Sequence, residues 1–174
     1  MRTRMMKAAM VAGMVAGFVL AFAATTPAQD HDDGSRQTYQ TANLFQVGSP
    51  TNLLGGGATL FRSKQRLVMR IATSGLDLNS AYTVWWVVFN NPAGCSAPGC
   101  GQDDLANPAA RPSVFYAAGF VTGIDGTGNV SAAVDAGPLA EGIDIEAGRG
   151  LRRGYGFRAE VHLVIRTHGM INPG

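Results

Sequence analysis

The sequence predicts an all-β protein: an antiparallel β-sandwich of six to eight strands that follows an N-terminal signal peptide. Apolar residues after position 37 recur in short runs, several with a period of two, and turns rich in Gly, Pro, Asn and Asp separate these runs. No such run keeps a helical period over a dozen residues. With 174 residues, the chain is long enough for one domain with a substantial core and too short to favour two.

The first 28 residues have the layout of a secretory signal peptide. A basic start precedes an uncharged apolar run over 8–24, and small residues suited to cleavage end at Ala23 and at Ala28. We expect cleavage after one of these two alanines, export to the periplasm or the extracellular space, and no membrane insertion of the cleaved chain. The alternative is an uncleaved anchor, because about seventeen apolar residues reach the lower limit for a membrane span.

The charge of the chain depends on this segment. The whole sequence has 14 basic and 12 acidic residues, and three of the basic ones, Arg2, Arg4 and Lys7, lie in the predicted signal peptide. The cleaved chain keeps 11 basic residues against 12 acidic ones, a net charge of about −1. Its charge therefore gives no reason to expect nucleic acid as a partner.

The rest of the chain divides into an arm and one domain. Residues 29–37, QDHDDGSRQ, are polar and acidic, which predicts a flexible arm outside the core. A single β-sandwich domain then covers 38–174. Its predicted strands are 40–46, 59–62, 65–73, 82–90, 113–122, 129–135 and 155–167.

Residue patterns indicate where several of these strands lie. In the third, Leu67, Met69 and Ile71 share one face, which is typical of a sheet with one side in water. The fourth, YTVWWVVFN, is apolar on both faces, so we expect it at the centre of a sheet, covered on both sides. Between the fifth and the sixth, the turn GIDGTGN predicts a hairpin, since it is dense in residues that tolerate positive φ.

The only two cysteines, Cys95 and Cys100, lie in a loop directly after the fourth predicted strand. In an oxidising compartment, two cysteines on either side of a Pro-Gly turn favour a disulfide. A zinc site is an alternative that would need further ligands, from histidines or from carboxylates such as Asp103 and Asp104. A redox pair is another alternative, although the spacing differs from Cys-x-x-Cys and no helix signal follows.

The three histidines supply one candidate metal site. If the later cleavage site is used, the mature chain begins Gln-Asp-His31, and its amine, two amides and imidazole could bind Cu(II) in a square plane. His162 and His168 share a face of the last predicted strand, but six residues of strand put them about 20 Å apart. We therefore expect these two to be exposed polar residues that do not share an ion, and we expect no other cofactor.

Four arginines, Arg149, Arg152, Arg153 and Arg158, lie in a Gly-rich stretch, GRGLRRGYGFR. Guanidinium groups bind sulfate, phosphate and carboxylate groups in a bidentate manner. The stretch is therefore a candidate binding site for an anionic glycan, and a solvated basic loop is the alternative.

One block of the sequence resembles a family of uncharacterised secreted bacterial β-proteins. The residues that carry the resemblance are YTVWWVVFNNP from Tyr82, then Cys95, Cys100-Gly101, Asp104-Leu105, Gly119, Gly126-x-Gly128 and the ending His168-Gly169 to Pro173-Gly174. More distantly, the strand pattern is similar to that of CHRD domains of extracellular proteins. These domains often carry a histidine in the strand before the hairpin, whereas 116–120 holds none here.

The resemblance implies secretion and an Ig-like or CHRD-like β-sandwich, and it brings no established reaction. Members of the secreted family continue with a further strand. The resemblance therefore implies a C-terminally truncated member with an unpaired sheet edge, and such an edge favours self-association.

Together these observations predict an exported protein with a structural or binding role. They favour a non-enzymatic protein, since the sequence has no Gly-x-Ser-x-Gly motif and Ser96 has no recognisable base. Two alternatives stay open: a metal-binding protein or metalloenzyme that uses His31, His162 or His168, and an anionic-glycan binder that uses 149–158. The partners to expect are an extracellular glycan or a second copy bound at a sheet edge.

Overall fold

The structure is a computed structural model, and it describes residues 17–22, 37–46, 52–140 and 150–171. Side chains are described over 37–44, 55–140 and 150–171, and the other described residues by their backbone alone. Among the described residues, no helix is both long and apolar enough to cross a membrane. His31 and Arg149 lie outside the described residues, as does most of the predicted arm.

The fold is an all-β sandwich, which confirms the predicted class, and the described residues contain no α-helix. All strand pairs are antiparallel. Two short 3-10 helices, η2 (Pro92–Gly94) and η3 (Gln102–Ala106), lie in the loop between β5 and β6. The strands are β1 (Gly17–Phe22), β2 (Thr38–Gln46), β3 (Asn52–Arg62), β4 (Arg66–Thr73), β5 (Ser80–Phe89), β6 (Pro112–Val121), β7 (Gly128–Asp135) and β8 (Glu160–Met170).

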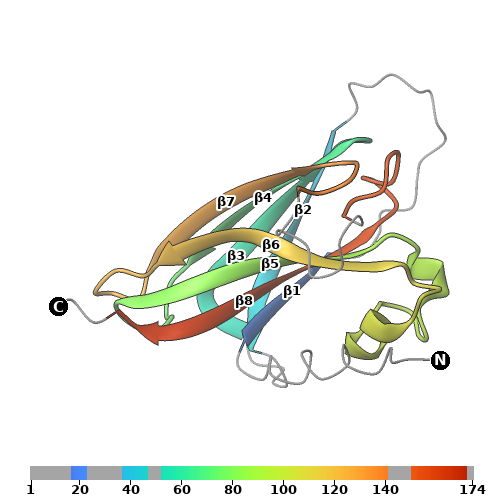
Figure 1. The fold of residues 1–174 in the computed structure, drawn as a ribbon. Coiled ribbons are helices and arrows are strands. Elements are labelled where there is room, and N and C mark those ends of the chain that lie inside the picture. The colour runs from blue at the N-terminus through green and yellow to red at the C-terminus, as the bar shows by residue number, and fades with distance from the viewer. Residues whose placement is uncertain (1–16, 23–36, 47–51, 141–149, 172–174) are drawn as a thin grey trace.

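The strands form two layers that β1 connects. One layer is a three-stranded sheet in the order β6-β5-β8, and the other is a four-stranded sheet in the order β2-β3-β4-β7. Strand β1 lies between β8 and β2, so that the hydrogen-bonded order runs without a break from β6 to β7 (Figure 1). The two layers share one core, because the same cluster of buried side chains draws on strands of both.

Alternation along the strands supplies that core. In β4, Leu67 and Met69 are fully buried and Arg70 is exposed, as the period of two predicted. From the opposite sheet, Trp86 of β5 stacks on Phe115 of β6 with ring centroids 6.4 Å apart. A large apolar side chain buried to this degree stabilises the fold by about 1.5–3 kcal/mol.

Strand β5 is the centre of the three-stranded sheet, as its apolar sequence predicted. It is hydrogen-bonded to β6 on one side and to β8 on the other. Val84, Trp86 and Val88 point into the shared core, and Val87 and Phe89 are buried on the opposite face. Both faces of the C-terminal half of this strand are therefore covered.

Among the described residues three charged side chains are buried, Arg62, Asp104 and Glu160, and Arg62 is the basic one. Arg62, at the end of β3, is only 1 % exposed and donates hydrogen bonds to the carbonyl oxygens of Gly156 and Ala159, at 3.0 and 2.9 Å. Its Nε also donates to Gln40 Oε1 at 2.7 Å. Burial lowers the pKa of Arg62 to about 10, against the opposing effect of the Glu160 charge, so the group stays protonated at neutral pH. Arg62 thus ties the four-stranded sheet to the residues that lead into β8.

The predicted hairpin between the fifth and sixth strands is wrong. Strand β6 pairs with β5 and strand β7 pairs with β4, so the turn between β6 and β7 crosses from one layer to the other. The turn signal itself is real: Gly126 has φ +72°, and its carbonyl oxygen accepts a hydrogen bond from the N–H of Leu76. A turn sequence specifies that the chain reverses, but it does not specify that the two strands bond to each other.

Strand β8, the last strand of the described residues, does not lie at a sheet edge. Strand β8 is bonded to β5 on one side and to β1 on the other, and the edge strands are β6 and β7. The partner that covers β8, residues 17–22, lies inside the predicted signal peptide. Signal-peptide cleavage and the presence of β1 are therefore mutually exclusive for any one molecule.

Candidate functional site

The loop between β5 and β6 covers the outer face of the three-stranded sheet. Backbone hydrogen bonds from Asn90 to Arg111 and from Asn91 to Ala110 continue the β5–β6 pairing into the base of the loop. Above this base, Cys100 and Ala110 are buried against Val87 and Phe89 of β5. The loop therefore packs on the outer face of the sheet, and backbone hydrogen bonds hold its two ends together.

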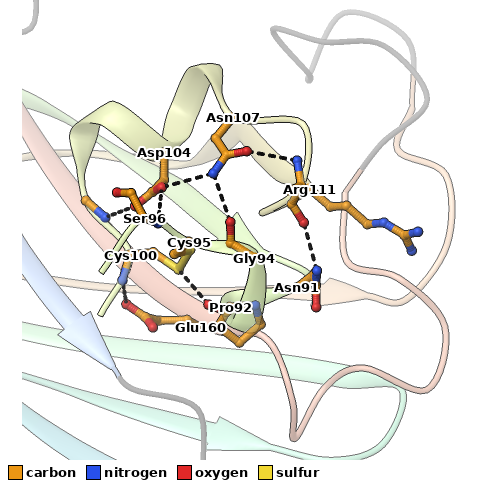
Figure 2. The surroundings of a disulfide bond; sticks show 12 residues. Asn91, Pro92, Gly94, Cys95, Ser96, Cys100, Asp104, Asn107, Arg111 and Glu160 are labelled. Atoms are coloured by element: carbon orange, nitrogen blue, oxygen red, sulfur yellow. Dashed lines mark hydrogen bonds between the residues drawn. A yellow bond between two sulfur atoms is a disulfide. The ribbon is translucent and has the colours of Figure 1, made fainter. Parts of the chain in front are cut away.

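Cys95 and Cys100 form a disulfide in this loop, with their Cα atoms 5.3 Å apart (Figure 2). The backbone N–H of Cys100 donates to Glu160 Oε1 at 2.8 Å, and the same oxygen lies 2.8 Å from His162 Nε2. The bond from Cys100 to Glu160 thus anchors the disulfide-bonded loop to the start of β8. Because both sulfurs are in this bond, they are not available as thiolate ligands.

Asp104 is the second anchor of the loop. Its side chain is buried and accepts hydrogen bonds from the backbone N–H groups of Ser96, at 2.8 Å, and Gly101, at 2.9 Å (Figure 2). These bonds, with a further one from Asn107, lower the pKa of Asp104 to about 2. Asp103 beside it is exposed, so the two acids have different surroundings.

The two strand histidines do not come together. His162 is partly buried between Glu160 and the ring of Phe89, whose centroid is 5.4 Å from that of the imidazole, so the prediction of an exposed residue is wrong for it. His168 is exposed, as predicted, and its ring contacts the hydroxyl of Thr83. Within the described ranges, no three His, Cys, Asp or Glu side chains form a group that could hold a metal ion.

Three arginines line a hollow of about 540 Å³ at the base of the loop. Arg152 and Arg153 were predicted from the sequence, whereas Arg111 comes from the far end of the loop, and its side chain extends away from the disulfide (Figure 2). Arg158 is exposed but does not line the hollow. In the described part of the chain, no carboxylate lies within ion-pair distance of the three lining arginines. We call this feature the arginine hollow.

Hydrogen bonds to buried side chains fix the backbone of the arginine hollow. Asn90 donates from its side-chain amide to the carbonyl oxygen of Gly150 at 2.9 Å and accepts from the N–H of Arg152 at 2.8 Å. Ser113 accepts from the N–H of Gly150 at 2.7 Å. Gly150 has φ +88°, and a Cβ there would lie 2.8 Å from the side chain of Leu139, so the position requires glycine. The segment that carries Arg152 is thus held rigidly against the end of β5.

The backbone of Arg111 is in an uncommon conformation, with φ +51°. A residue with a Cβ at such a φ costs about 1–3 kcal/mol unless its surroundings compensate, and such residues cluster at functional sites. Here the carbonyl oxygen of Arg111 accepts from the N–H of Asn90 at 3.1 Å, which holds it in place. Glycine would fit this position without strain, yet the chain has arginine.

The sequence alone did not identify Arg111 or Asn90 as part of a site. Arg111 lies 41 positions before Arg152, and only the pairing of β5, β6 and the loop base brings them together. The one local signal was the Asn90-Asn91-Pro92 strand ending, since buried asparagine amides usually position a backbone segment.

A larger and more open hollow, of about 800 Å³, lies on the four-stranded sheet. Its lining contains a single charged side chain, Arg70, whose guanidinium lies 5.4 Å from the ring centroid of Phe61. The other side chains that line it are small, apolar or neutral, and they include Thr41, Asn43, Thr59, Asn129 and Ser131. It therefore offers less charge for ligand binding than the arginine hollow does.

Comparison of the chain with protein-family models, with curated proteins and with solved structures finds no match. The resemblance to the secreted family and to CHRD domains thus stays a prediction.

Proposed function

We propose that the protein is an exported, non-enzymatic binding module that holds an anionic ligand in the arginine hollow. The ligand class is an acidic glycan, recognised through its carboxylate or sulfate groups. The observation that carries the proposal is the convergence of Arg111, Arg152 and Arg153 on one hollow.

Three features support this function. Guanidinium groups bind carboxylate and sulfate groups in pairs of parallel hydrogen bonds, and three of them around one hollow can engage more than one anionic group. Arg152 also lies 4.8 Å from the ring centroid of Tyr155, a contact that restricts its side chain before a ligand arrives. The hollow includes two exposed prolines, Pro108 and Pro138, whose apolar rings suit the non-polar face of a sugar ring.

The proposal is tested by calorimetric titration of the exported protein with a sulfated or uronic-acid oligosaccharide. We expect binding that weakens as salt rises, because guanidinium–anion pairs at a surface are screened. Substituting Arg111, Arg152 or Arg153 with alanine should each weaken binding by about tenfold, the loss expected for one charge-assisted hydrogen-bonded pair.

Arg158→Ala is the matched control, since Arg158 belongs to the same basic stretch and does not line the hollow. Equal losses for Arg158→Ala and Arg152→Ala would reduce the effect to net charge and contradict the proposal. A neutral oligosaccharide of the same length should not bind at the arginine hollow. Binding of that neutral sugar with no response to any of the three substitutions would point to the larger hollow on the four-stranded sheet instead.

A further inference from the structure

Strand β1 is the only strand in the described residues that joins the two layers by backbone hydrogen bonds. Its six residues pair with Val161–Arg166 of β8, and two of them also pair with Phe45 and Gln46 of β2. Figure 1 shows β1, in blue, beside β8, in red. Without β1, the fold is a three-stranded sheet packed on a four-stranded one, and β8 and β2 are both edge strands along one seam.

The same six residues belong to the apolar run of the predicted signal peptide. Both predicted cleavage sites, after Ala23 and after Ala28, lie beyond Phe22, so cleavage at either one removes the whole of β1. The inference below rests on the export that is part of the proposed function. It concerns a different surface from the arginine hollow.

Cleavage leaves a specific defect in the fold. Val161, Leu163 and Ile165 of β8 are fully buried, and they are the residues directly paired with Phe22, Leu20 and Phe18. The main-chain N–H and C=O groups of β8 that face β1 lose their partners, and the side chains of these three residues gain contact with water along the seam. An exposed apolar edge of this length is either covered or an aggregation hazard.

We propose that the seam between β8 and β2 is an acceptor site for a strand supplied by another exported polypeptide. The partner segment is extended, at least six residues long and antiparallel to β8. It carries apolar residues at the three alternate positions opposite Val161, Leu163 and Ile165. Addition of such a strand supplies main-chain hydrogen bonds for affinity and side-chain pockets for specificity.

Insertion of one strand fits the seam better than edge-to-edge pairing of two copies. In the structure the strand at this place is bonded on both sides, to β8 and to β2. The β8 strand of a second copy would bond to one edge only, and its apolar side chains would stay engaged in its own core. A free strand can form main-chain hydrogen bonds with both β8 and β2, and its apolar side chains can pack beside Val161, Leu163 and Ile165. A separate extended segment is therefore the occupant.

The outer face of β8 favours an acidic residue at one position of the bound strand. Gly17, Val19 and Ala21 of β1 pair with Arg166, Val164 and His162. Arg166 is exposed, so an acidic residue opposite it would form a cross-strand ion pair, worth a few-fold in affinity at low salt.

The test uses the full chain, with a specific protease site placed within 29–36. After folding and cleavage, the N-terminal fragment should remain bound and should exchange with a labelled synthetic peptide of residues 16–23 flanked by lysines. We expect the labelled peptide to bind, and a peptide with Leu20→Pro to bind about 100-fold more weakly, because proline lacks the N–H group and disrupts the ladder. A peptide with Gly17→Glu should bind a few-fold more tightly at low salt.

Equal affinity for the proline peptide and the parent peptide would overturn the proposal, as would failure of the labelled peptide to exchange. Dimers of the cleaved protein that the peptide does not dissociate would show edge-to-edge pairing instead. The mass of the exported protein supplies an independent check. An exported chain that still contains residues 17–22 overturns the acceptor proposal, because its own strand fills the seam, and leaves anion binding at the arginine hollow unaffected.

Discussion

The loop end of the molecule and the β1 seam are held together in opposite ways. At the loop end, several interactions fix the backbone: the Cys95–Cys100 disulfide and the bonds of Asp104, which join residues close in sequence, and the side-chain bonds of Asn90, which join the end of β5 to Gly150 and Arg152. At the seam, a single six-residue strand from the far N-terminus closes the gap between two sheets. The end that carries the arginine hollow is thus preorganised, whereas the seam depends on a strand that lies inside the predicted signal peptide.

Removal of residues 1–28 should give the largest effect. Loss of β1 exposes Val161, Leu163 and Ile165 of β8 and breaks the main-chain hydrogen bonds between β1 and β8. We therefore expect the free energy of unfolding to fall by roughly 4 kcal/mol. Urea denaturation of the full and shortened chains measures this. A chain that lacks only residues 1–16 keeps β1 and should match the full chain. If the two deletions have equal effects, β1 contributes nothing to the fold.

Arg62→Leu should destabilise the protein by about 3 kcal/mol, since it leaves the buried carbonyl oxygens of Gly156 and Ala159 without this donor. Arg66→Leu is the matched control on the next strand. Arg66 forms an exposed ion pair with Asp135, and its loss should cost less than about 1 kcal/mol. Chemical denaturation compares the two, and similar costs would contradict the anchoring role of Arg62.

Replacing both Cys95 and Cys100 with serine should cost about 2 kcal/mol, as expected for closure of so short a loop. The protein should show no free thiol in a colorimetric thiol assay until it is reduced. A free thiol before reduction would mean that the loop end lacks its covalent anchor. The seam should not respond, so hydrogen exchange of β8 should be the same with and without the disulfide.

The acid sensitivity of the loop end should depend on Asp104. Its pKa is lowered in the fold to about 2, so its contribution is complete above the ordinary value near 3.8 and is lost as the pH falls toward 2. Between about pH 4 and pH 2 the melting temperature should fall less steeply in Asp104→Asn than in the parent protein. Asp103→Asn is the control, because Asp103 is exposed. It should keep the steep parent profile.

The smallest expected effect is a gain. Arg111→Gly removes the cost of φ +51°, so we expect stability to rise by about 1 kcal/mol while affinity for the anionic oligosaccharide falls. Thermal melting and calorimetry on the same variant separate the two. If stability does not rise and affinity does not fall in this variant, Arg111 is a surface residue without a role in the arginine hollow.

Much of the fold could be predicted from local patterns. The alternation of Leu67, Met69 and Ile71 indicated which face of β4 is buried, and the apolar run at Trp85-Trp86 indicated a central strand. The Cys-Ser-Ala-Pro-Gly-Cys loop likewise indicated the disulfide. Each of these depends on neighbours within a few residues.

The rest depends on pairings between distant segments, which no local pattern encodes. The β6–β7 turn has hairpin chemistry, yet its two strands bond to β5 and β4. His162 alternates like an exposed residue, but Glu160 and the ring of Phe89 partly bury it. Arg111 became part of a site only because the loop base returns it beside Arg152.

Amide hydrogen exchange of the full chain and of the chain without residues 1–28 compares the two regions most directly. We predict that those amides of Val161–Arg166 that face β1 lose protection when residues 1–28 are removed and regain it when the parent peptide is added, while those that face β5 stay protected. The amides of Cys100, Gly150 and Arg152 at the loop end should stay protected throughout. Equal protection of β8 in both forms, or loss of protection at both regions together, would contradict the account.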